Sequence, residues 1–284
     1  MRIRTTRRRF LGTAGIAGLA GAAPPASARI EPSPWGIKLG LATYTFRNFE
    51  RPKVIEMIKQ VRTPWISIKN TEQQLSLDSR PSQLVEIRKQ FDAAGLKVTS
   101  AGNIDMTKGN SVADLRPIFE WAKAFGLPMM VCAPTHQNIG HVERLVKEYN
   151  IRIAIHNHGP EDHNFPTPES VLEVVRKLDE RCGLCLDIGH SARAGVDLVK
   201  AVAGAGSRLF DMHVKDLADA GAKDSQCDVG DGVLPLPGIF KQLKKMNYQG
   251  CVNLEYEIHA DDPMPGVQRS FSYMRGVLAG LAAA

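Results

Sequence analysis

The chain has 284 residues, of which 43% are hydrophobic and 23% charged, as in ordinary folded globular proteins. This composition excludes a disordered, collagen-like or coiled-coil chain. The formal net charge is +6, but residues 1–28 hold five arginines and no acidic residue. The rest of the chain is nearly neutral, so no electrostatic argument supports a nucleic-acid partner.

Residues 1–28 have the layout of an export signal: a charged start, a short apolar stretch and a small-x-small ending. The stretch Thr6-Arg7-Arg8-Arg9-Phe10-Leu11 contains an arginine pair followed by Phe-Leu, which resembles the twin-arginine motif of the Tat pathway. A retained membrane anchor is the weaker alternative, because a spanning helix takes about 20 apolar residues. We therefore expect a Tat-type signal peptide over 1–28, the Tat export machinery as a partner, and a periplasmic or extracellular mature chain over 29–284.

The five cysteines are an odd number and do not form the dense pattern of a disulfide scaffold. Cys182 and Cys185 have the spacing of a redox or zinc pair, but Cys185 lies inside an apolar run and no second such pair exists. We therefore expect buried free thiols.

Short apolar runs alternate with amphipathic stretches along the rest of the chain. Eight runs of four to seven residues are predicted strands. They are 36–42, 65–69, 97–101, 129–132, 152–156, 183–187, 209–214 and 252–256.

Helix signals lie between the predicted strands. The stretch 80–94 has apolar residues at helical spacing, and so has 111–125. Ser111 and Asp114 resemble a capping box at the start of the second stretch, whereas Pro117 would kink that helix or mark its true start.

Further helix boundaries complete the alternation. Thr167-Pro168 provides an N-cap followed by proline at the first helical position. Gly95 and Gly126 end two helices, and a last helix begins at about Val267. Eight strand–helix units in about 250 residues predict an α/β fold, a single (β/α)8 TIM barrel. A doubly wound sheet is less favoured, because no glycine-rich turn follows the first strand.

Polar residues collect at the carboxyl ends of the predicted strands, where a barrel carries its active site. Six of the eight histidines lie in the last four strands or just after them. Strand alternation lets His156 and His158 point the same way, and Glu255 and Glu257 likewise. Each residue alone has an ordinary structural explanation, but their joint placement favours a metal site. Imidazole with carboxylate suits Mn, Fe, Co or Zn, with no thiolate required.

Three segments together are specific in their order and spacing. They read GLCLDIGH at 183–190, DMHVKD at 211–216 and GCVNLEYE at 250–257. With them the chain resembles the sugar phosphate isomerase/epimerase family, the xylose isomerase-like TIM barrels, from about Leu39 to the C-terminus. That superfamily includes ketose 3-epimerases, hydroxypyruvate isomerase, inosose dehydratases and endonuclease IV.

The resemblance implies one divalent metal ion, a small-molecule carbohydrate substrate and a set of ligands. The implied metal ligands are His156, Asp187, His213 and Glu255. His190 matches the substrate-binding histidine of the family, and Lys215 and Tyr44 are further candidate substrate contacts.

The departures from the family pattern concern proton transfer. Many relatives read Glu-Asn-His at the end of the fifth strand, whereas this chain reads His156-Asn157-His158. One of the two metal-bound glutamates of the ketose epimerases is therefore missing. Asp219 stands where those epimerases have a substrate arginine. A metal-bound imidazole nitrogen cannot also act as a base, so His156 either binds metal or moves protons.

A mechanism compatible with these departures uses the metal as a Lewis acid on a sugar carbonyl or its neighbouring hydroxyl. A base among Lys69, Glu255 and His158 then removes the adjacent proton, giving an enediolate. Lys69 can serve if desolvation lowers its pKa. Reprotonation gives an isomerase or epimerase.

Three alternatives stay open. The first is a lyase or dehydratase, in which the enediolate expels a β-substituent of a keto-sugar or keto-glycoside. The second is a non-catalytic sugar-binding barrel. The third, a metal-dependent nuclease, is disfavoured by the low charge and the export signal. Substrate specificity depends on loops such as 219–237, in which we interpret Gly230-Asp231-Gly232 as a turn.

Overall fold

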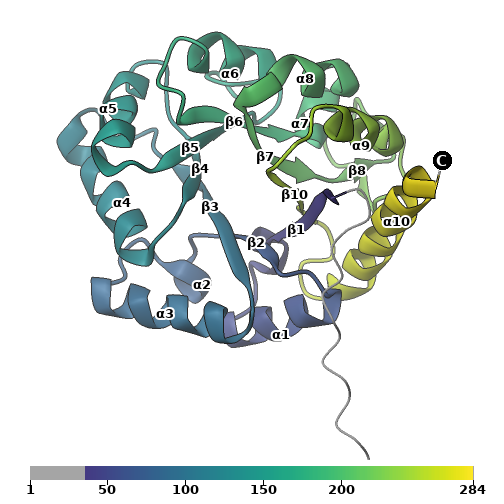
Figure 1. Ribbon diagram of the computed structural model, residues 1–284, viewed down its shortest axis with the longest axis horizontal. Coiled ribbons are helices and arrows are strands. Elements are labelled where there is room, and N and C mark those ends of the chain that lie inside the picture. The colour runs from purple at the N-terminus through teal and green to yellow at the C-terminus, as the bar shows by residue number, and fades with distance from the viewer. Residues whose placement is uncertain (1–35, 284) are drawn as a thin grey trace, which may run out of the picture.

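In the computed structural model, which describes residues 36–283, eight parallel strands close into a barrel (Figure 1). The expected signal peptide, 1–28, lies outside the described residues. The barrel strands are β1 (Lys38–Ala42), β2 (Trp65–Ile68), β3 (Lys97–Asp105), β4 (Met129–Ala133), β5 (Arg152–His156), β6 (Cys182–Asp187), β7 (Leu209–Val214) and β10 (Cys251–Leu254). The predicted TIM barrel is therefore confirmed.

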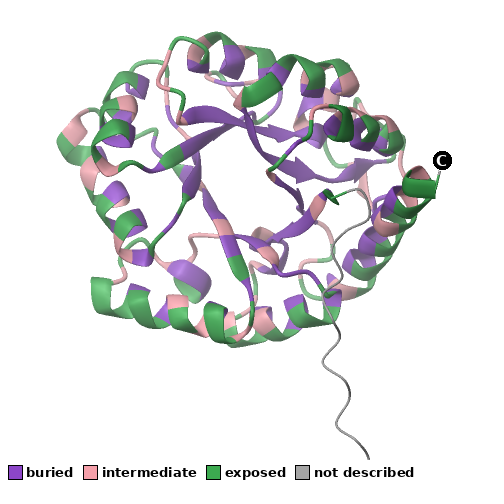
Figure 2. Cartoon of the chain, in the orientation of Figure 1, coloured by how far each residue is buried: buried purple, intermediate pink, exposed green. Residues whose placement is uncertain are grey.

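Helices surround the barrel and turn their apolar sides toward it. Figure 2 shows buried strands inside a ring of helices whose outer faces are exposed. The helices are α1 (Arg51–Val61), α2 (Glu72–Leu75), α3 (Pro81–Ala93), α4 (Val112–Phe125), α5 (Ile139–Tyr149), α6 (Pro168–Val175), α7 (Ile188–Arg193), α8 (Leu198–Ala205), α9 (Leu236–Lys245) and α10 (Met264–Ala283). Two short 3-10 turns, η2 (Thr43–Phe46) and η3 (Gly206–Arg208), complete the connections.

The barrel closes where β1 pairs with β2 on one side and with β10 on the other. Closure leaves no free sheet edge and brings the carboxyl ends of all eight strands to one mouth. Strand β3 runs four residues beyond its predicted end, because Ile104 and Asp105 pair with Cys132 and Ala133 of β4. The glycine and asparagine at 102–103 had broken the apolar pattern on which the prediction depended.

The helix termini follow the predicted capping chemistry. The Ser111 hydroxyl accepts a hydrogen bond from the Asp114 backbone N–H at 3.2 Å, and Thr167 caps α6 in the same way. Gly126 ends α4 in the left-handed conformation. Pro117 lies inside α4 and does not mark its start. The Ser111 cap fixes the start of α4 at Val112, so Pro117 lies beyond the first turn of the helix.

The long connection after β7 contains a small hairpin that the sequence pattern did not reveal. Strands β8 (Asp216–Leu217) and β9 (Gln226–Cys227) pair antiparallel within it. The backbone N–H groups of Gly230, Gly232 and Leu234 all donate to the Asp216 carboxylate. The glycine turn therefore binds the Asp216 carboxylate through its backbone, and these hydrogen bonds anchor the loop beside the barrel mouth.

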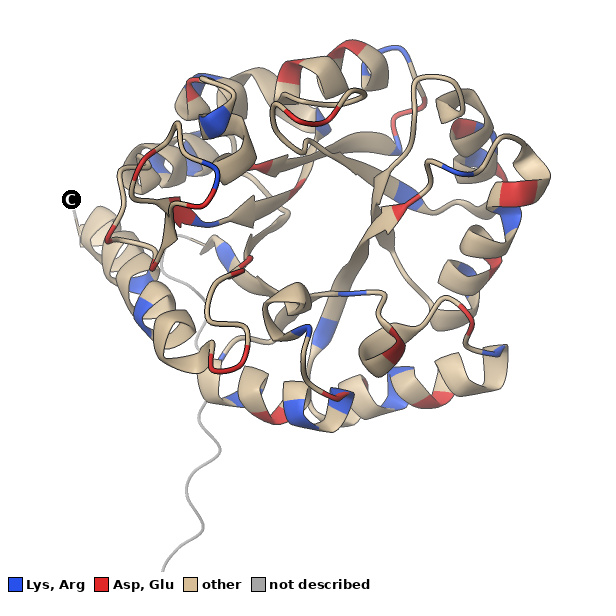
Figure 3. Ribbon diagram, turned by 180° about the vertical axis from the view of Figure 1, so that it is seen from behind, with Lys and Arg blue, Asp and Glu red and all other residues tan. Residues whose placement is uncertain are grey.

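Positions of basic and acidic residues are interspersed along the outer helices and loops in the rear view (Figure 3). Within residues 36–283, none of the helices combines the length and the apolar character that a bilayer crossing needs.

The close packing of β1 against β10 gives a stability prediction. A Cβ added at Gly40 would overlap the Asn253 side-chain oxygen inside the barrel and lie 3.2 Å from the Trp65 carbonyl. We expect Gly40→Ala to lower the free energy of unfolding by about 1–3 kcal/mol, as overpacked cores do. Gly276→Ala is the control, since nothing lies within 4 Å of that helical position. It should raise stability by about 0.5–1 kcal/mol. Urea unfolding measures both, and equal stability of wild type and Gly40→Ala would contradict the packing.

Candidate metal centre

Four nearly fully buried side chains converge at the barrel mouth: His156, Asp187, His213 and Glu255. His156 Nε2 lies 3.1 Å from His213 Nδ1 and 3.5 Å from Asp187 Oδ2. His213 Nδ1 lies 3.1 Å from Glu255 Oε2. One donor atom from each residue falls within 4.8 Å of all the others.

The barrel itself brings these four residues together. His156 and Asp187 are the last residues of β5 and β6, His213 is the penultimate residue of β7, and Glu255 directly follows β10. Asp187 is opposite His213 in the strand register. Because parallel strands end at one rim of a barrel, residues distant in sequence become neighbours there.

The donor set fits a divalent metal ion. Asp187 Oδ2 is buried without a hydrogen bond of normal geometry, and its neighbours are the Lys215 ammonium at 3.1 Å and His156 Nε2 at 3.5 Å, so this oxygen faces a place for a cation. Three of the donor separations are 3.1–3.5 Å, close to the roughly 3.4 Å expected in a tetrahedral site with bonds of about 2.0–2.1 Å, and the others lie within 4.8 Å. Two imidazole nitrogens and two carboxylate oxygens suit Zn, Mn, Co or Fe.

The local electrostatics keeps His156, Asp187 and Glu255 in their metal-binding forms. Burial lowers the pKa of His156, which favours the neutral imidazole. Burial alone would raise the pKa of Asp187 and of Glu255. The positive charge of Lys215 outweighs burial at Asp187 and holds its pKa well below the usual range. His213 and Lys215 together do the same for the pKa of Glu255. Both carboxylates are therefore ionised at neutral pH. Burial alone would lower the pKa of His213, but the neighbouring Cys185 and Glu255 outweigh it and raise that pKa well above its usual value, so His213 must lose a proton to bind metal.

One neighbour of the cluster was missed by sequence reasoning. The Cys185 sulfur lies within 4.8 Å of donor nitrogens of His156 and His213. Cys185 is a buried free thiol, as expected, and burial raises its pKa to about 12. It precedes Asp187 by two residues on β6, so the strand period already placed it on the same face.

His190 lies beside the cluster in α7. Its backbone N–H donates to Asp187 Oδ1 at 2.8 Å, and its ring centroid is 5.8 Å from that of His156. Burial lowers its pKa to about 4, so the ring is neutral at neutral pH. Arg193 approaches His190 Nδ1 at 3.3 Å and can only donate, which places the ring proton on Nε2.

His158 is near the cluster for a different reason from the one expected. Strand β5 ends at His156, so alternation does not orient His158 as predicted. Asn157 turns inward instead and hydrogen-bonds the backbone of Asp187. The exposed His158 ring lies 4.5 Å from the His190 ring and 5.5 Å from that of His156.

The predicted residues from the first two strands line another side of the mouth. Lys69 Nζ donates to the Asn103 carbonyl at 2.9 Å and lies 5.3 Å from the centre of the Tyr44 ring. Burial lowers the pKa of Lys69. Lys215 is not free at the mouth, because its ammonium contacts the carboxylates of Asp187, Glu255 and Glu257.

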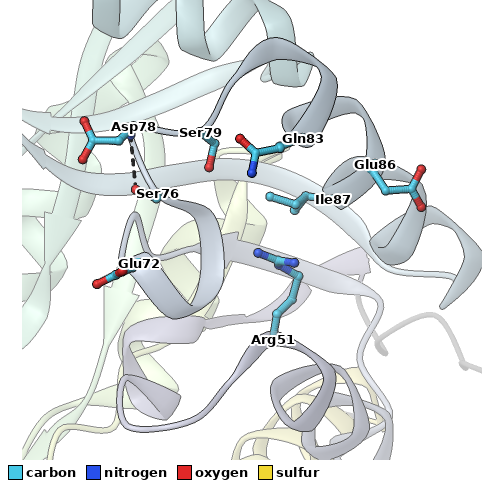
Figure 4. A pocket seen from close by; sticks show the side chains of 8 residues that line it. All are labelled: Arg51, Glu72, Ser76, Asp78, Ser79, Gln83, Glu86 and Ile87. Carbon is cyan, nitrogen blue, oxygen red and sulfur yellow. Dashed lines mark hydrogen bonds between the residues drawn. The ribbon is translucent and has the colours of Figure 1, made fainter.

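A separate hollow of about 430 Å³ lies outside the barrel between α1, α2 and α3 (Figure 4). Its lining residues are Arg51, Glu72, Ser76, Asp78, Ser79, Gln83, Glu86 and Ile87. Among the described residues, the metal-ligating side chains gather at the barrel mouth and not in this hollow. The mouth is therefore the candidate site.

Comparison with known proteins agrees with the fold. The family model described as xylose isomerase-like TIM barrel matches residues 64–277. An inosose dehydratase of Mesomycoplasma hyopneumoniae (strain 7448) is 25% identical over 162 residues, which cover 50% of this chain and 53% of that protein. The chain thus aligns with about half the length of this curated relative.

Two solved structures share the architecture at low sequence identity. The IOLI protein, with a bound zinc atom, has a TM-score of 0.70 at 17% identity, covering 86% of this chain and 99% of that one. The 3-keto-D-glucoside 4-epimerase of E. coli has a TM-score of 0.68 at 19% identity, covering 84% and 99%. At these identities the likeness concerns the fold.

Below the metal cluster, Asp211 is fully buried inside the barrel. Its carboxylate accepts hydrogen bonds from Ser100 at 2.8 Å, from Asn253 at 2.6 Å and from the Met212 backbone at 2.9 Å. Burial outweighs these bonds and raises its pKa to about 6. The folded protein thus retains a proton that the unfolded chain releases near pH 4.

This proton gives a pH prediction. Between about pH 4 and pH 6 only the folded state holds it, so the free energy of unfolding falls as pH rises, by about 3 kcal/mol in total. Asp211→Asn should lack this contribution. Urea unfolding of chelator-treated wild type and Asp211→Asn is measured between pH 4 and pH 6. The difference between their free energies of unfolding gives the contribution of the Asp211 proton. A difference that is flat with pH, or of opposite slope, would contradict the raised pKa.

Proposed function

The chain belongs to the xylose isomerase-like TIM barrel family, and on that basis we propose a divalent-metal-dependent isomerase or epimerase of a sugar or keto-sugar. The observation that carries the proposal is the buried cluster of His156, Asp187, His213 and Glu255 at the mouth of the barrel. The relative named a 3-keto-D-glucoside 4-epimerase supports the substrate class.

In this proposal the four clustered residues hold one metal ion. When bound, the ion supplies Lewis-acid polarisation of a substrate oxygen. Neutral His190, with its proton on Nε2, donates a hydrogen bond to a substrate hydroxyl or carbonyl. The half-buried Tyr44 lies next to Lys69 and provides an aromatic surface at the mouth.

Lys69 is the favoured base in this proposal. Its burial lowers the pKa, so a larger fraction is in the neutral form that accepts a proton from the carbon next to a carbonyl. His158, exposed at the mouth, is the second candidate. Glu255 is the least available of the three, because Oε2 already contacts His213 and Lys215.

A second candidate reaction is elimination, as in a lyase or dehydratase. It is favoured by His156, which by the resemblance stands where the ketose epimerases have the first of their two metal-bound glutamates, so one member of the proton-transfer pair is missing. The relative named inosose dehydratase supports it as well. Both reactions begin with the same proton removal. They diverge when the carbanionic carbon is reprotonated or when a β-substituent leaves.

Proton removal can be tested by solvent exchange. Metal-loaded protein is incubated in D2O with a panel of ketohexoses and 3-keto-glycosides, and NMR follows deuterium at the carbon next to the carbonyl. We expect exchange with at least one compound, and a loss of about 100-fold or more in Lys69→Met. His141→Gln is the control, since His141 is exposed on α5.

The products separate the candidate reactions. An epimer or isomer with incorporated deuterium supports the first reaction, and an unsaturated product with a released substituent supports elimination. No exchange with any compound favours a sugar-binding barrel without catalysis. Full exchange in Lys69→Met with loss in His158→Gln would move the base to His158.

We also propose export through the Tat pathway, based on the arginine pair and the apolar stretch within residues 1–28. Replacing Arg7, Arg8 and Arg9 together with lysine should retain the protein inside the cell, whereas wild type leaves it. Cell fractionation with immunodetection measures this. Equal distribution of the two proteins would contradict Tat export.

A further inference from the structure

Lys215 places a positive charge inside the candidate metal centre. Its ammonium lies 3.1 Å from Asp187 Oδ2 and 3.0 Å from Glu255 Oε2, and it also contacts Glu257 Oε2. The side chain is only 4% exposed. A charge buried this deeply is tolerated only with close counter-charges, so these contacts determine where the ammonium rests.

The ammonium uses the same oxygen atoms that a metal ion would use. Asp187 Oδ2 also faces His156 Nε2 at 3.5 Å, and Glu255 Oε2 faces His213 Nδ1 at 3.1 Å. Lysine and a divalent ion therefore share two acceptors. Like charges this close repel strongly where water is excluded.

The third carboxylate already contacts the ammonium and can hold it without the other two. Glu257 lies outside the four-residue cluster and its side chain is 35% exposed. Three carboxylates balance one ammonium and one divalent ion in formal charge. Both cations can therefore be held together if the ammonium withdraws toward Glu257 when the ion arrives.

The fold provides a specific path for the lysine stem. A Cβ at Gly189 would lie 2.6 Å from both Cγ and Cδ of Lys215. Only glycine at this position of α7 lets the stem run along the helix to the carboxylates. The placement of the ammonium is thus a feature of the packing around it.

We propose that Lys215 is a positioning residue that competes with the metal ion for Asp187 and Glu255, and that Glu257 alone retains its ammonium when metal binds. The inference rests on the metal site of the proposed function. It predicts that removing the lysine tightens metal binding, whereas a lysine that merely supports the two carboxylates would weaken binding when removed.

The test is Zn²⁺ titration of the chelator-treated full chain by calorimetry. Lys215→Met should bind Zn²⁺ about 10-fold or more tightly than wild type, and Glu257→Gln about 10-fold more weakly. In the double variant the loss due to Glu257→Gln should disappear, because no ammonium remains for Glu257 to hold. Lys200→Met is the matched control, since Lys200 forms an exposed ion pair with Asp197.

Each outcome decides the proposal. Unchanged or weaker Zn²⁺ binding by Lys215→Met overturns it, and so does an undiminished effect of Glu257→Gln in the double variant. If wild type still binds Zn²⁺ when the competition is overturned, the proposed metal site stands. If neither wild type nor Lys215→Met takes up Zn²⁺, both the metal site and the competition are overturned. If Lys215→Met takes up Zn²⁺ and wild type does not, the competition is supported. If Lys215→Met does not fold, weaker binding by Glu257→Gln supports the proposal and unchanged binding overturns it.

Discussion

Asp187 and Glu255 are two buried carboxylates that need a cation, and the organisation of the barrel mouth depends on that need. A buried carboxylate without a counter-charge costs several kcal/mol. The mouth provides Lys215 as one counter-charge and two histidines as further metal donors. Asn157 and the first turn of α7 hold Asp187 by hydrogen bonds to its backbone and side chain. Closure of the barrel excludes water from the cluster, which strengthens every one of these interactions.

Much of this arrangement could be predicted from local sequence patterns. Short apolar runs alternating with amphipathic stretches specify strands and helices, and eight such units in about 250 residues are typical of a TIM barrel. The barrel then places the residues at the strand ends in one site. That rule is sufficient to bring Asp187, His213 and Glu255 together, because each lies at or directly after the end of an apolar run. The capping residues Ser111 and Thr167 were readable because caps act within one helical turn.

Other features depend on contacts between distant residues and left no local signal. Lys215 lies two residues after His213, so its side of the strand was readable from the sequence. Its three carboxylate partners were not, because they come from β6 and from the segment after β10. The role of Gly189 in its path is visible only when α7 packs beside β7. His158 was placed by strand alternation, which fails once β5 ends at His156. The turn after the β8–β9 hairpin is anchored by Asp216, whose carboxylate accepts from backbone N–H groups up to 18 residues away.

The central claim is that this cluster holds one divalent metal ion. Elemental analysis of protein purified without chelators or a histidine tag tests it most directly. The structure predicts about one divalent ion per chain in wild type and its loss in His213→Ala, since that variant removes a donor from the middle of the cluster. Wild-type protein that contains no metal and takes up no added Mn²⁺, Co²⁺ or Zn²⁺ would contradict the claim.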